Sequence, residues 1–495
     1  MKEFAALDPP PVIAAAPDTK SVAVLAFDNL SGEKDNEYFS DGISDELLNQ
    51  LGKVPGLRVA GRTSAFSFKG KNVPEAEIAQ KLGVTYVVNG TVQKSGTQVR
   101  ITAWLINAAD GFQIWSDKFT KELKDIFAVQ DKIAGLIAQN LSLKLGYTPR
   151  TTTTVNPEAH RLVLEGRQFW NLRTTEGFTQ AEASLTKAIA LDPLFSQAHA
   201  ALADVCVQRA NYALQDGASW GDVVEDVKRG RTEAQRAVEL DPTLVEANTT
   251  LGYCLLLESH YAEAGQQFQK ALLLNPNYAA MHAWYATLLD TLGQLDQGIQ
   301  EQEKALELDP LWAATLSNYG ENLFFVQRYE DTLMVSDRVI AVRPDVPVQS
   351  LGNRARALFG LGRKAEAIEA ARMVRQNLGK NPRRGADCSA IWVLSRAGLQ
   401  QEAAAYAEDF FKILPASSQE RGFALGALGR FDEALPFLER TPPLVRRRLY
   451  WDPMWDQWRD DPRFKQLIAK FGCEAEYKVA RETLARMLKE QEAKK

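Results

Sequence analysis

Four prolines at a fixed interval constrain the fold of this chain more than any other feature. Pro242, Pro276, Pro310 and Pro344 lie 34 residues apart and close the similar segments VELDP, LLLNP, LELDP and AVRP. A constant period of this length indicates supersecondary units that stack on one another in place of a single globular core. Because stacked units form extended surfaces, we expect the chain to bind a partner.

Each period predicts two helices packed side by side. In residues 279–310, apolar residues from Met281 to Leu292 form one stripe, Gly293 interrupts it, and a second stripe continues to Pro310. Neither helix could bury its stripe alone, so neighbouring units must lean on one another and build a curved rod.

The period is not uniform along the chain. Pro193 and Pro242 are 49 residues apart, so residues 212–224 are expected to add a turn or a loop to one unit. Similar helix-turn-helix segments continue at drifting spacing as far as residue 440. We count about eight units over residues 157–440.

These units resemble tetratricopeptide (TPR) repeats. The tryptophan that is typical of the family is absent from two repeats, where Asn248 and His282 occupy its position. Its small–large–small–proline pattern is present in two second helices, as Ala264, Phe268, Ala271 and Pro276, and as Ala181, Leu185, Ala188 and Pro193. Its first helix is matched at Leu251 and Gly252, and at Tyr319 and Gly320.

The resemblance implies a peptide or protein partner on the concave face of the solenoid. The family register places seven residues on this face: Glu246, Thr249, Tyr253, Thr287, Asp290, Ser317 and Glu321. These side chains are uncharged or acidic, which favours a neutral or basic peptide. The alternative is that many of them are simply solvated.

Residues 21–147 predict a different structure, a small mixed α/β domain. The continuous apolar run 21–27 is typical of a strand buried on both faces, and 98–106 alternates like a half-buried antiparallel strand. The full expected order is βαβαβββα, with strands over 21–27, 57–61, 84–94, 98–106 and 112–120, and with helices near 43–51, 75–82 and 125–145. Ser44, followed by two acidic residues, is the expected start of the first helix.

Several blocks of this region resemble the TolB-like N-terminal domain, which is related to the flagellar FlgO domain. They include SVAVLAFDNLSGEKDNEYFSDGISDELLNQL, LRVAGRTSAFSFKGK and LGVTYVVNGTVQKSGTQVRITAWLINAADGFQIWSDKF. In bacterial proteins this domain often precedes TPR repeats and follows a membrane segment joined to an adenylate cyclase, a kinase or a winged-helix domain. The resemblance implies the sensor or interaction half of a signalling protein and no cyclase activity in this chain.

The remaining segments are expected to connect or cap these two regions. Residues 1–20 and 148–156 are rich in Pro, Ala or Thr and are typical of linkers. A chain that opens inside a linker is expected to be cut from something longer. Residues 441–495 predict an aromatic cap followed by a charged helix.

Composition gives no general reason to expect nucleic-acid or metal binding. The net charge is −5, and the basic run 446–448 is explained by a solvated face or by contact with a carboxylate-rich helix. The four cysteines and four histidines are dispersed, without the spacing of a metal site. We therefore predict no cofactor, no metal and no membrane insertion by this chain.

The candidates for chemistry each have a structural alternative. Asp41, Asp45 and Glu46 could form an acid–base cluster, but a helix start explains them equally well. Residues 62–71 combine basic and aromatic side chains, so they form either a ligand loop or a crossing loop whose phenylalanines fill the core. The tryptophans at 451, 455 and 458 fit cap packing or a binding hot spot.

The leading hypothesis is a non-enzymatic interaction scaffold of a bacterial signalling or envelope assembly. The alternative is the regulatory part of a membrane-tethered adenylate cyclase, kinase or winged-helix transcription factor. A third hypothesis is that the solenoid is the substrate arm of a glycan-handling enzyme. The lack of a catalytic domain in the sequence argues against it. Taken alone the chain is expected to be soluble and cytoplasmic, or periplasmic if an upstream membrane helix tethers it.

Overall fold

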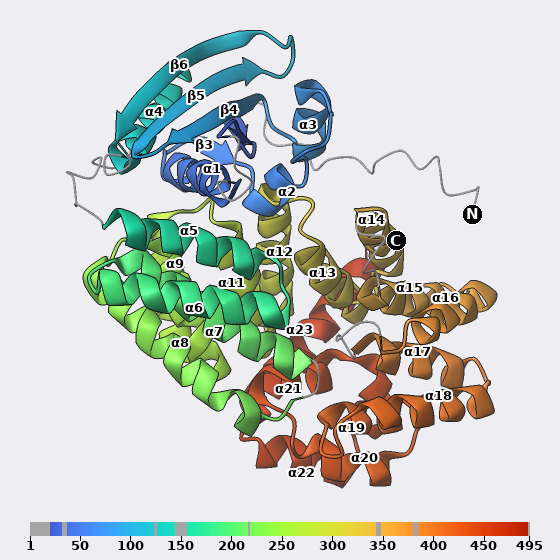
Figure 1. Cartoon of the computed structure of the whole chain (residues 1–495). Helices are drawn as coiled ribbons and strands as arrows, with labels where there is room; N and C mark the ends of the chain where they lie inside the picture. Colours follow the sequence, from blue (N-terminus) through green and yellow to red (C-terminus); the bar gives the residue numbers. More distant parts are fainter. Residues whose placement is uncertain are drawn as a thin grey trace.

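The computed structural model describes residues 20–31, 37–122, 126–143, 156–215, 218–342, 348–379 and 385–493. A small mixed sheet with its helices lies on top of a larger, curled array of helices (Figure 1). The predicted combination of an α/β region and a helical repeat region is therefore present.

The sheet combines parallel and antiparallel pairing. Its strands run in the order β3-β1-β4-β5-β6, with β2 beside β4. β1 is parallel to β3 and β4, whereas β4, β5 and β6 form the predicted antiparallel meander. The strands are β1 (Lys20–Val24), β2 (Asp28–Asn29), β3 (Leu57–Val59), β4 (Tyr86–Ser95), β5 (Gln98–Asn107) and β6 (Gln113–Glu122).

Helices cover both faces of this sheet. α1 (Glu37–Gly52) and α4 (Ile126–Asn140) bury one face, on a cluster that includes Ile43, Ile101 and Leu105. α2 (Arg62–Phe66) and α3 (Glu75–Leu82) cover part of the other.

The predicted start of the first helix is wrong. α1 begins at Glu37, and Ser44 lies inside it. The buried Ser44 hydroxyl accepts a hydrogen bond from the Phe27 N–H at 2.9 Å and donates one to the Ser40 carbonyl at 3.1 Å. A short polar side chain within a helix can bond to the carbonyl four residues earlier, so it does not need to mark a helix start.

In the part of the repeat region that the structure describes, the helices form eight successive antiparallel pairs. They are α5 (Pro157–Asn171), α6 (Thr175–Leu191), α7 (Ser196–Gln215), α8 (Trp220–Leu240), α9 (Val245–Leu257), α10 (Tyr261–Leu274), α11 (Ala279–Thr291), α12 (Leu295–Leu308), α13 (Ala313–Phe325), α14 (Tyr329–Val342), α15 (Val348–Gly360), α16 (Lys364–Gln376), α17 (Gly385–Arg396), α18 (Gln400–Ile413), α19 (Gln419–Ala427) and α20 (Phe431–Leu438). α7 and α8 have 20 and 21 residues, whereas α9 and α10 have 13 and 14. Longer helices therefore account for the 49-residue interval.

One polar position recurs in the first helix of three pairs, six residues after the proline. His199 bridges the Pro193 carbonyl and the Glu233 carboxylate, at 3.1 and 2.6 Å. His282 makes the corresponding contacts with Pro276 and Glu301, at 2.9 and 2.5 Å, while Asn248 donates to the Pro242 carbonyl at 3.2 Å. These side chains tie each turn to the helices that follow it.

The C-terminal segment runs back along the inside of the curled array. It contains α21 (Pro443–Trp451), a 3-10 helix (Pro453–Trp458), α22 (Pro462–Lys470) and α23 (Glu474–Glu492). α21 packs on α9 and α11, and α23 packs on α12. The array curls far enough for Gln419 of α19 to donate to the Leu214 carbonyl of α7 at 3.4 Å. The predicted solenoid of stacked helix pairs is thus present, and it is tightly curled around its C-terminal helices.

Candidate functional site

The seven predicted partner-binding residues lie on α9, α11 and α13, the first helices of three successive pairs. We call the side of these helices that carries them the inner face. Thr249, Tyr253, Asp290 and Ser317 are buried, whereas Glu246, Thr287 and Glu321 are half-buried. The inner face is therefore largely covered within the chain itself.

α21 covers the part of the inner face around Asp290. The Trp451 indole N–H donates to the Asp290 backbone carbonyl at 3.0 Å, and Arg447 lies 3.7 Å from the Asp290 carboxylate. The charge of Arg447 also acts on Tyr253 and Glu321, so three of the seven residues face one arginine.

The other two arginines of the basic run also have partners within the chain. Arg448 is buried and lies 3.3 Å from Glu420 of α19. Arg446 lies over the Phe471 ring, 4.2 Å from its centre. Contact with carboxylates on neighbouring helices thus accounts for much of this run.

The two inner-face carboxylates near Arg447 have pKa values moved in opposite directions. Burial raises the pKa of Asp290 to about 7, and its Oδ1 has no hydrogen-bond partner among the described residues. Burial also acts on Glu321, but three arginines lower its pKa below the ordinary value. Such a pair can mark catalysis. Here Asp290 pairs with Arg447 of α21, and Glu321 lies 3.6 Å from Arg356 of α15, so both carboxylates belong to contacts within the chain.

The ends of the seven-residue set have separate partners. Glu246 faces Arg167 of α5 and Lys53, and burial raises its pKa. Ser317 donates to the Ala313 carbonyl at 2.8 Å and lies 3.0 Å from the Ser350 hydroxyl. The structure therefore brings Tyr253, Asp290 and Glu321 together around Arg447 and leaves Glu246 at the junction with the α/β domain.

The α/β domain sits on the turns at one edge of the solenoid. The Asp309 carboxylate accepts hydrogen bonds from the Ser64 N–H at 2.7 Å and from the Thr63 N–H at 3.3 Å. One repeat earlier, the Asn277 amide donates to the carbonyls of Gly52 and Leu57, at 3.1 and 2.9 Å. The repeat turns thus supply hydrogen bonds to backbone groups of the other domain.

The predicted ligand or crossing loop 62–71 takes part in this junction. Its first residues form α2, whose N-terminal N–H groups are those bound by Asp309. Phe68 is buried against α3 and the sheet. In the described structure this segment fills the core and joins the two regions, which favours the crossing-loop interpretation.

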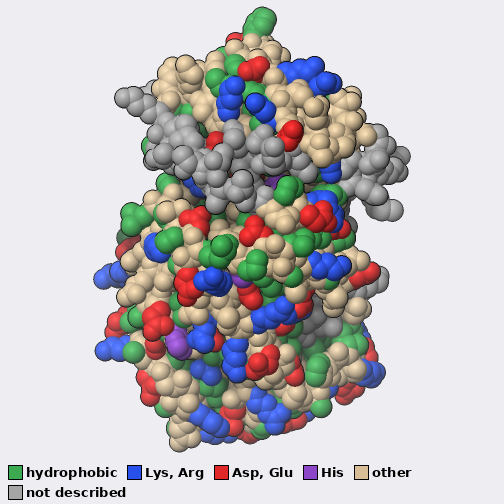
Figure 2. Space-filling view, turned by 60° about the vertical axis from the view of Figure 1, so that its left-hand side comes forward, with side chains coloured by type: hydrophobic (Ala, Val, Ile, Leu, Met, Phe, Trp, Pro, Cys, Tyr) green, Lys and Arg blue, Asp and Glu red, His purple; other side chains and the backbone are tan. Residues whose placement is uncertain are grey.

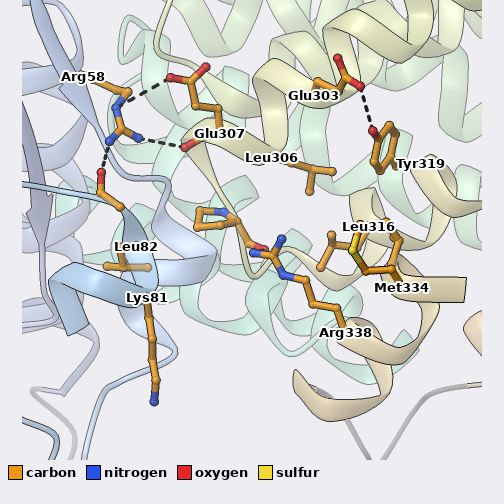
Figure 3. Close-up of a pocket in the computed structure, with 13 residues that line it drawn as sticks. Arg58, Lys81, Leu82, Glu303, Leu306, Glu307, Leu316, Tyr319, Met334 and Arg338 are labelled. Carbon is orange, nitrogen blue, oxygen red and sulfur yellow. Dashed lines mark hydrogen bonds and ion pairs between the residues drawn. The ribbon is translucent and has the colours of Figure 1, made fainter. Parts of the chain in front are cut away.

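A small pocket opens at the same junction, between α3 and β3 on one side and α12, α13 and α14 on the other (Figure 3). Its volume is about 130 Å³. Leu82, Leu306, Leu316 and Met334 form its apolar wall. The charged residues that line it are Arg58, Lys81, Arg338, Glu303 and Glu307. We call it the junction pocket.

Sequence reasoning did not find the junction pocket or the occupant of the inner face. Both depend on contacts between residues far apart in the chain, such as Arg58 with Glu307 and Trp451 with Asp290. One signal was available for the junction, because Asp241, Asn275 and Asp309 precede prolines at the 34-residue interval. Nothing in that pattern says which of the three turns meets another domain.

Among the described residues, no set of three or more His, Cys, Asp or Glu side chains could hold a metal ion. No helix in the same part of the chain is both long and apolar enough to span a membrane.

Comparison with known proteins identifies the repeats. Residues 279–310 match the family model of the tetratricopeptide repeat. The chain contains tetratricopeptide repeats. PilW, a type IV pilus biogenesis factor, has a solved structure that covers 45% of this chain and 94% of its own, at 15% identity and a TM-score of 0.36.

Three curated proteins share parts of the sequence. "Putative adenylate cyclase 3" of Rhizobium meliloti is 34% identical over 256 residues, which is 50% of this chain and 42% of that protein. Transcriptional regulator HilA of Salmonella typhimurium is 22% identical over 304 residues, 61% of this chain and 53% of the regulator. Hsp70-Hsp90 organizing protein 3 of Arabidopsis thaliana is 28% identical over 110 residues, 22% and 20% of the two chains. The chain thus spans about half the length, or less, of these relatives.

Proposed function

We propose that this chain is a non-enzymatic protein-interaction scaffold, the sensor or interaction arm of a bacterial signalling or envelope assembly. One observation carries the proposal: the inner face of the TPR solenoid already holds a helix, α21, through Arg447 and Trp451. A face that binds a helical segment within the chain has the shape and polar groups to bind one from a partner. The similarity to an Hsp70-Hsp90 organizing protein supports an interaction role.

The proposed partner is a neutral or basic peptide. Glu246, Asp290 and Glu321 give the inner face an acidic character, and the occupant it has is an arginine-bearing helix. Glu246, Thr287 and Glu321 are half-buried, so they are the members of the seven-residue set that a partner beside α21 would touch first. Of the buried members, Asp290 holds α21 in place through Trp451 and Arg447.

The α/β region is proposed to be a TolB-like domain. This is supported by the sequence blocks named above and by a sheet in which parallel β1, β3 and β4 continue into an antiparallel meander. In this proposal it fixes the solenoid in the larger assembly through the junction at Asn277 and Asp309.

Site-specific photo-crosslinking in native cells tests the inner face. A photoreactive residue replaces Thr287 on the inner face or, as the matched control, Leu273, whose side chain is 87% exposed on α10. The proposal expects a crosslink from position 287 to a second protein, competed by a basic helical peptide, and a weaker crosslink or none from position 273. Equal capture at both positions, or only internal crosslinks at 287, would contradict it.

A second candidate is the regulatory part of a protein that carries a cyclase, kinase or transcription-factor effector. The matches to a protein named as an adenylate cyclase and to a transcriptional regulator favour it, because about half of each relative lies outside the match. Immunoblotting of native cells separates the candidates, since an effector in the same polypeptide gives a band well above the mass of 495 residues. Fractionation of those cells decides between the cytoplasm and the periplasm.

A further inference from the structure

The junction pocket contains an arginine whose charge is not compensated. Arg338 extends from α14 toward the middle of the pocket (Figure 3). Among the described residues its hydrogen-bond partner is the Pro310 carbonyl, at 2.9 Å, and no carboxylate there is paired with it. Burial lowers the pKa of Arg338, and no neighbouring carboxylate acts against that effect. A desolvated cation without an anionic partner is costly, so the pocket favours a negative ligand.

A second arginine lines the opposite wall. Arg58 of β3 is 8% exposed and donates to the backbone carbonyls of Glu307 and Gly83. Its closest carboxylate, Glu307, is 4.0 Å away, and its Nε has no hydrogen-bond partner in the described structure. Burial lowers the pKa of Arg58 as well. Arg58 is therefore held by backbone carbonyls and by Glu307, and Arg338 is the pocket arginine that keeps N–H donors for an anion.

The rest of the pocket limits the size and character of the ligand. Leu306, Leu316 and Met334 form one apolar wall, and the Met334 side chain is 46% exposed. A volume of about 130 Å³ is below that of a typical drug-sized ligand site and suits a small molecule better than a folded peptide. The remaining acid, Glu303, is engaged by the Tyr319 hydroxyl at 2.8 Å.

We propose that the junction pocket binds a small carboxylic acid with a short apolar chain, the carboxylate on Arg338 and the chain over Leu306, Leu316 and Met334. Residues of both regions line the pocket, so the bound acid would lie between the α/β domain and the helices α12 and α13. This inference does not depend on the proposed scaffold function. It gives the α/β–solenoid junction a ligand to which it can respond.

Methionine-methyl NMR with sodium valerate as the probe tests the proposal. The chain has only six methionines, so the Met334 methyl signal can be identified with a Met334→Leu variant. We expect valerate to shift this signal saturably, with a Kd of about 1 mM, as suits a ligand of so few atoms. The Met373 methyl, 41% exposed on α16, serves as the internal control and should not move. Valeramide, which has the same shape without the charge, should bind at least about tenfold more weakly.

Two variants separate the pocket from general effects. Arg338→Gln should weaken valerate binding by about tenfold or more, because it removes a charged bidentate donor. Arg372→Gln, at an exposed arginine paired with Glu402, should leave binding unchanged. Met334→Trp, which fills the apolar part without altering a charge, should also block valerate. Equal affinity for valerate and valeramide, an unaffected Arg338→Gln variant, or no saturable shift would each overturn the proposal.

Discussion

At the scale of single residues, the side chain at one repeat position makes different hydrogen bonds, depending on which segment lies beside it. Asp241, Asn275 and Asp309 each precede a proline of the 34-residue period. Asp241 and Asn275 accept a hydrogen bond from the N–H two residues later, at 3.0 and 2.9 Å. Asp309 instead binds Thr63 and Ser64 of the α/β domain. Asp309 occupies a turn position of the repeat, but its carboxylate contacts the α/β domain.

Replacing Asp309 should therefore cost more than replacing Asp241. Asp309→Ala leaves the buried N–H groups of Thr63 and Ser64 without their acceptor, and we expect a loss of about 2 kcal/mol in the free energy of unfolding. Asp241→Ala removes only an exposed turn contact and should cost about 0.5 kcal/mol. Urea unfolding of both variants measures the difference. Equal losses would show that the domain contact contributes no more than the turn.

A second residue-scale prediction concerns Asp290 and pH. Burial raises the pKa of this carboxyl from 3.8 to about 7. Between those values the folded state binds more protons than the unfolded state, so the stabilisation is complete at low pH and is lost as the pH rises toward 7. Asp290→Asn cannot ionise, and its stability relative to the parent should rise by on the order of 2 kcal/mol from about pH 5 to about pH 8.

Urea unfolding of Asp290→Asn and the parent at both pH values measures that difference. Asp110→Asn, at the exposed turn after β5, is the control for a carboxyl at the surface. A stability difference for Asp290→Asn that stays constant with pH would show that the buried carboxyl does not titrate in this range.

At the scale of elements, the sequence determines most helices and strands but not their partners. The stripe from Met281 to Leu292 predicts α11 because a period of 3.6 residues is a local property. The turns could be predicted equally well from their glycines. The packing of α21 on α11 could not be predicted, because Arg447 and Trp451 contact Asp290 although they lie far from it in the sequence. The register thus predicted which residues share the inner face, while what covers them required the tertiary structure.

The close packing of α23 on the repeats can be measured with two glycines in equivalent turns. Gly293 and Gly398 both have positive φ, of 81° and 84°. A Cβ at Gly293 would lie 2.5 Å from the Glu476 carbonyl oxygen, whereas a Cβ at Gly398 would meet nothing within 4 Å. Gly398→Ala should cost about 1 kcal/mol for the left-handed backbone alone. Gly293→Ala should cost about 2 kcal/mol more, because the backbone of α23 must move.

Thermal unfolding of the two glycine variants provides the comparison, with the parent chain as reference. The backbone penalty is common to both, so their difference reports the contact between α23 and the turn after α11. If both variants lose the same stability, α23 does not pack closely there.

At the scale of the whole molecule, charges of both signs are interspersed over the face of the repeat region shown in Figure 2. That face presents no field of one sign, in keeping with a net charge of −5 over 495 residues. In the proposed scaffold, recognition would therefore depend on local sites, the inner face and the junction pocket, more than on long-range attraction.

The tight curl of the helix pairs predicts a compact particle in solution. The contact of Gln419 with Leu214 joins α19 to α7, and the C-terminal helices fill the space between them. A compact chain of this length should have a radius of gyration of about 23 Å. An open superhelix of the same helix pairs would be distinctly longer, because each pair would add its thickness to the rod. Small-angle X-ray scattering distinguishes the two, and a radius above about 30 Å would mean that the curled array opens in solution.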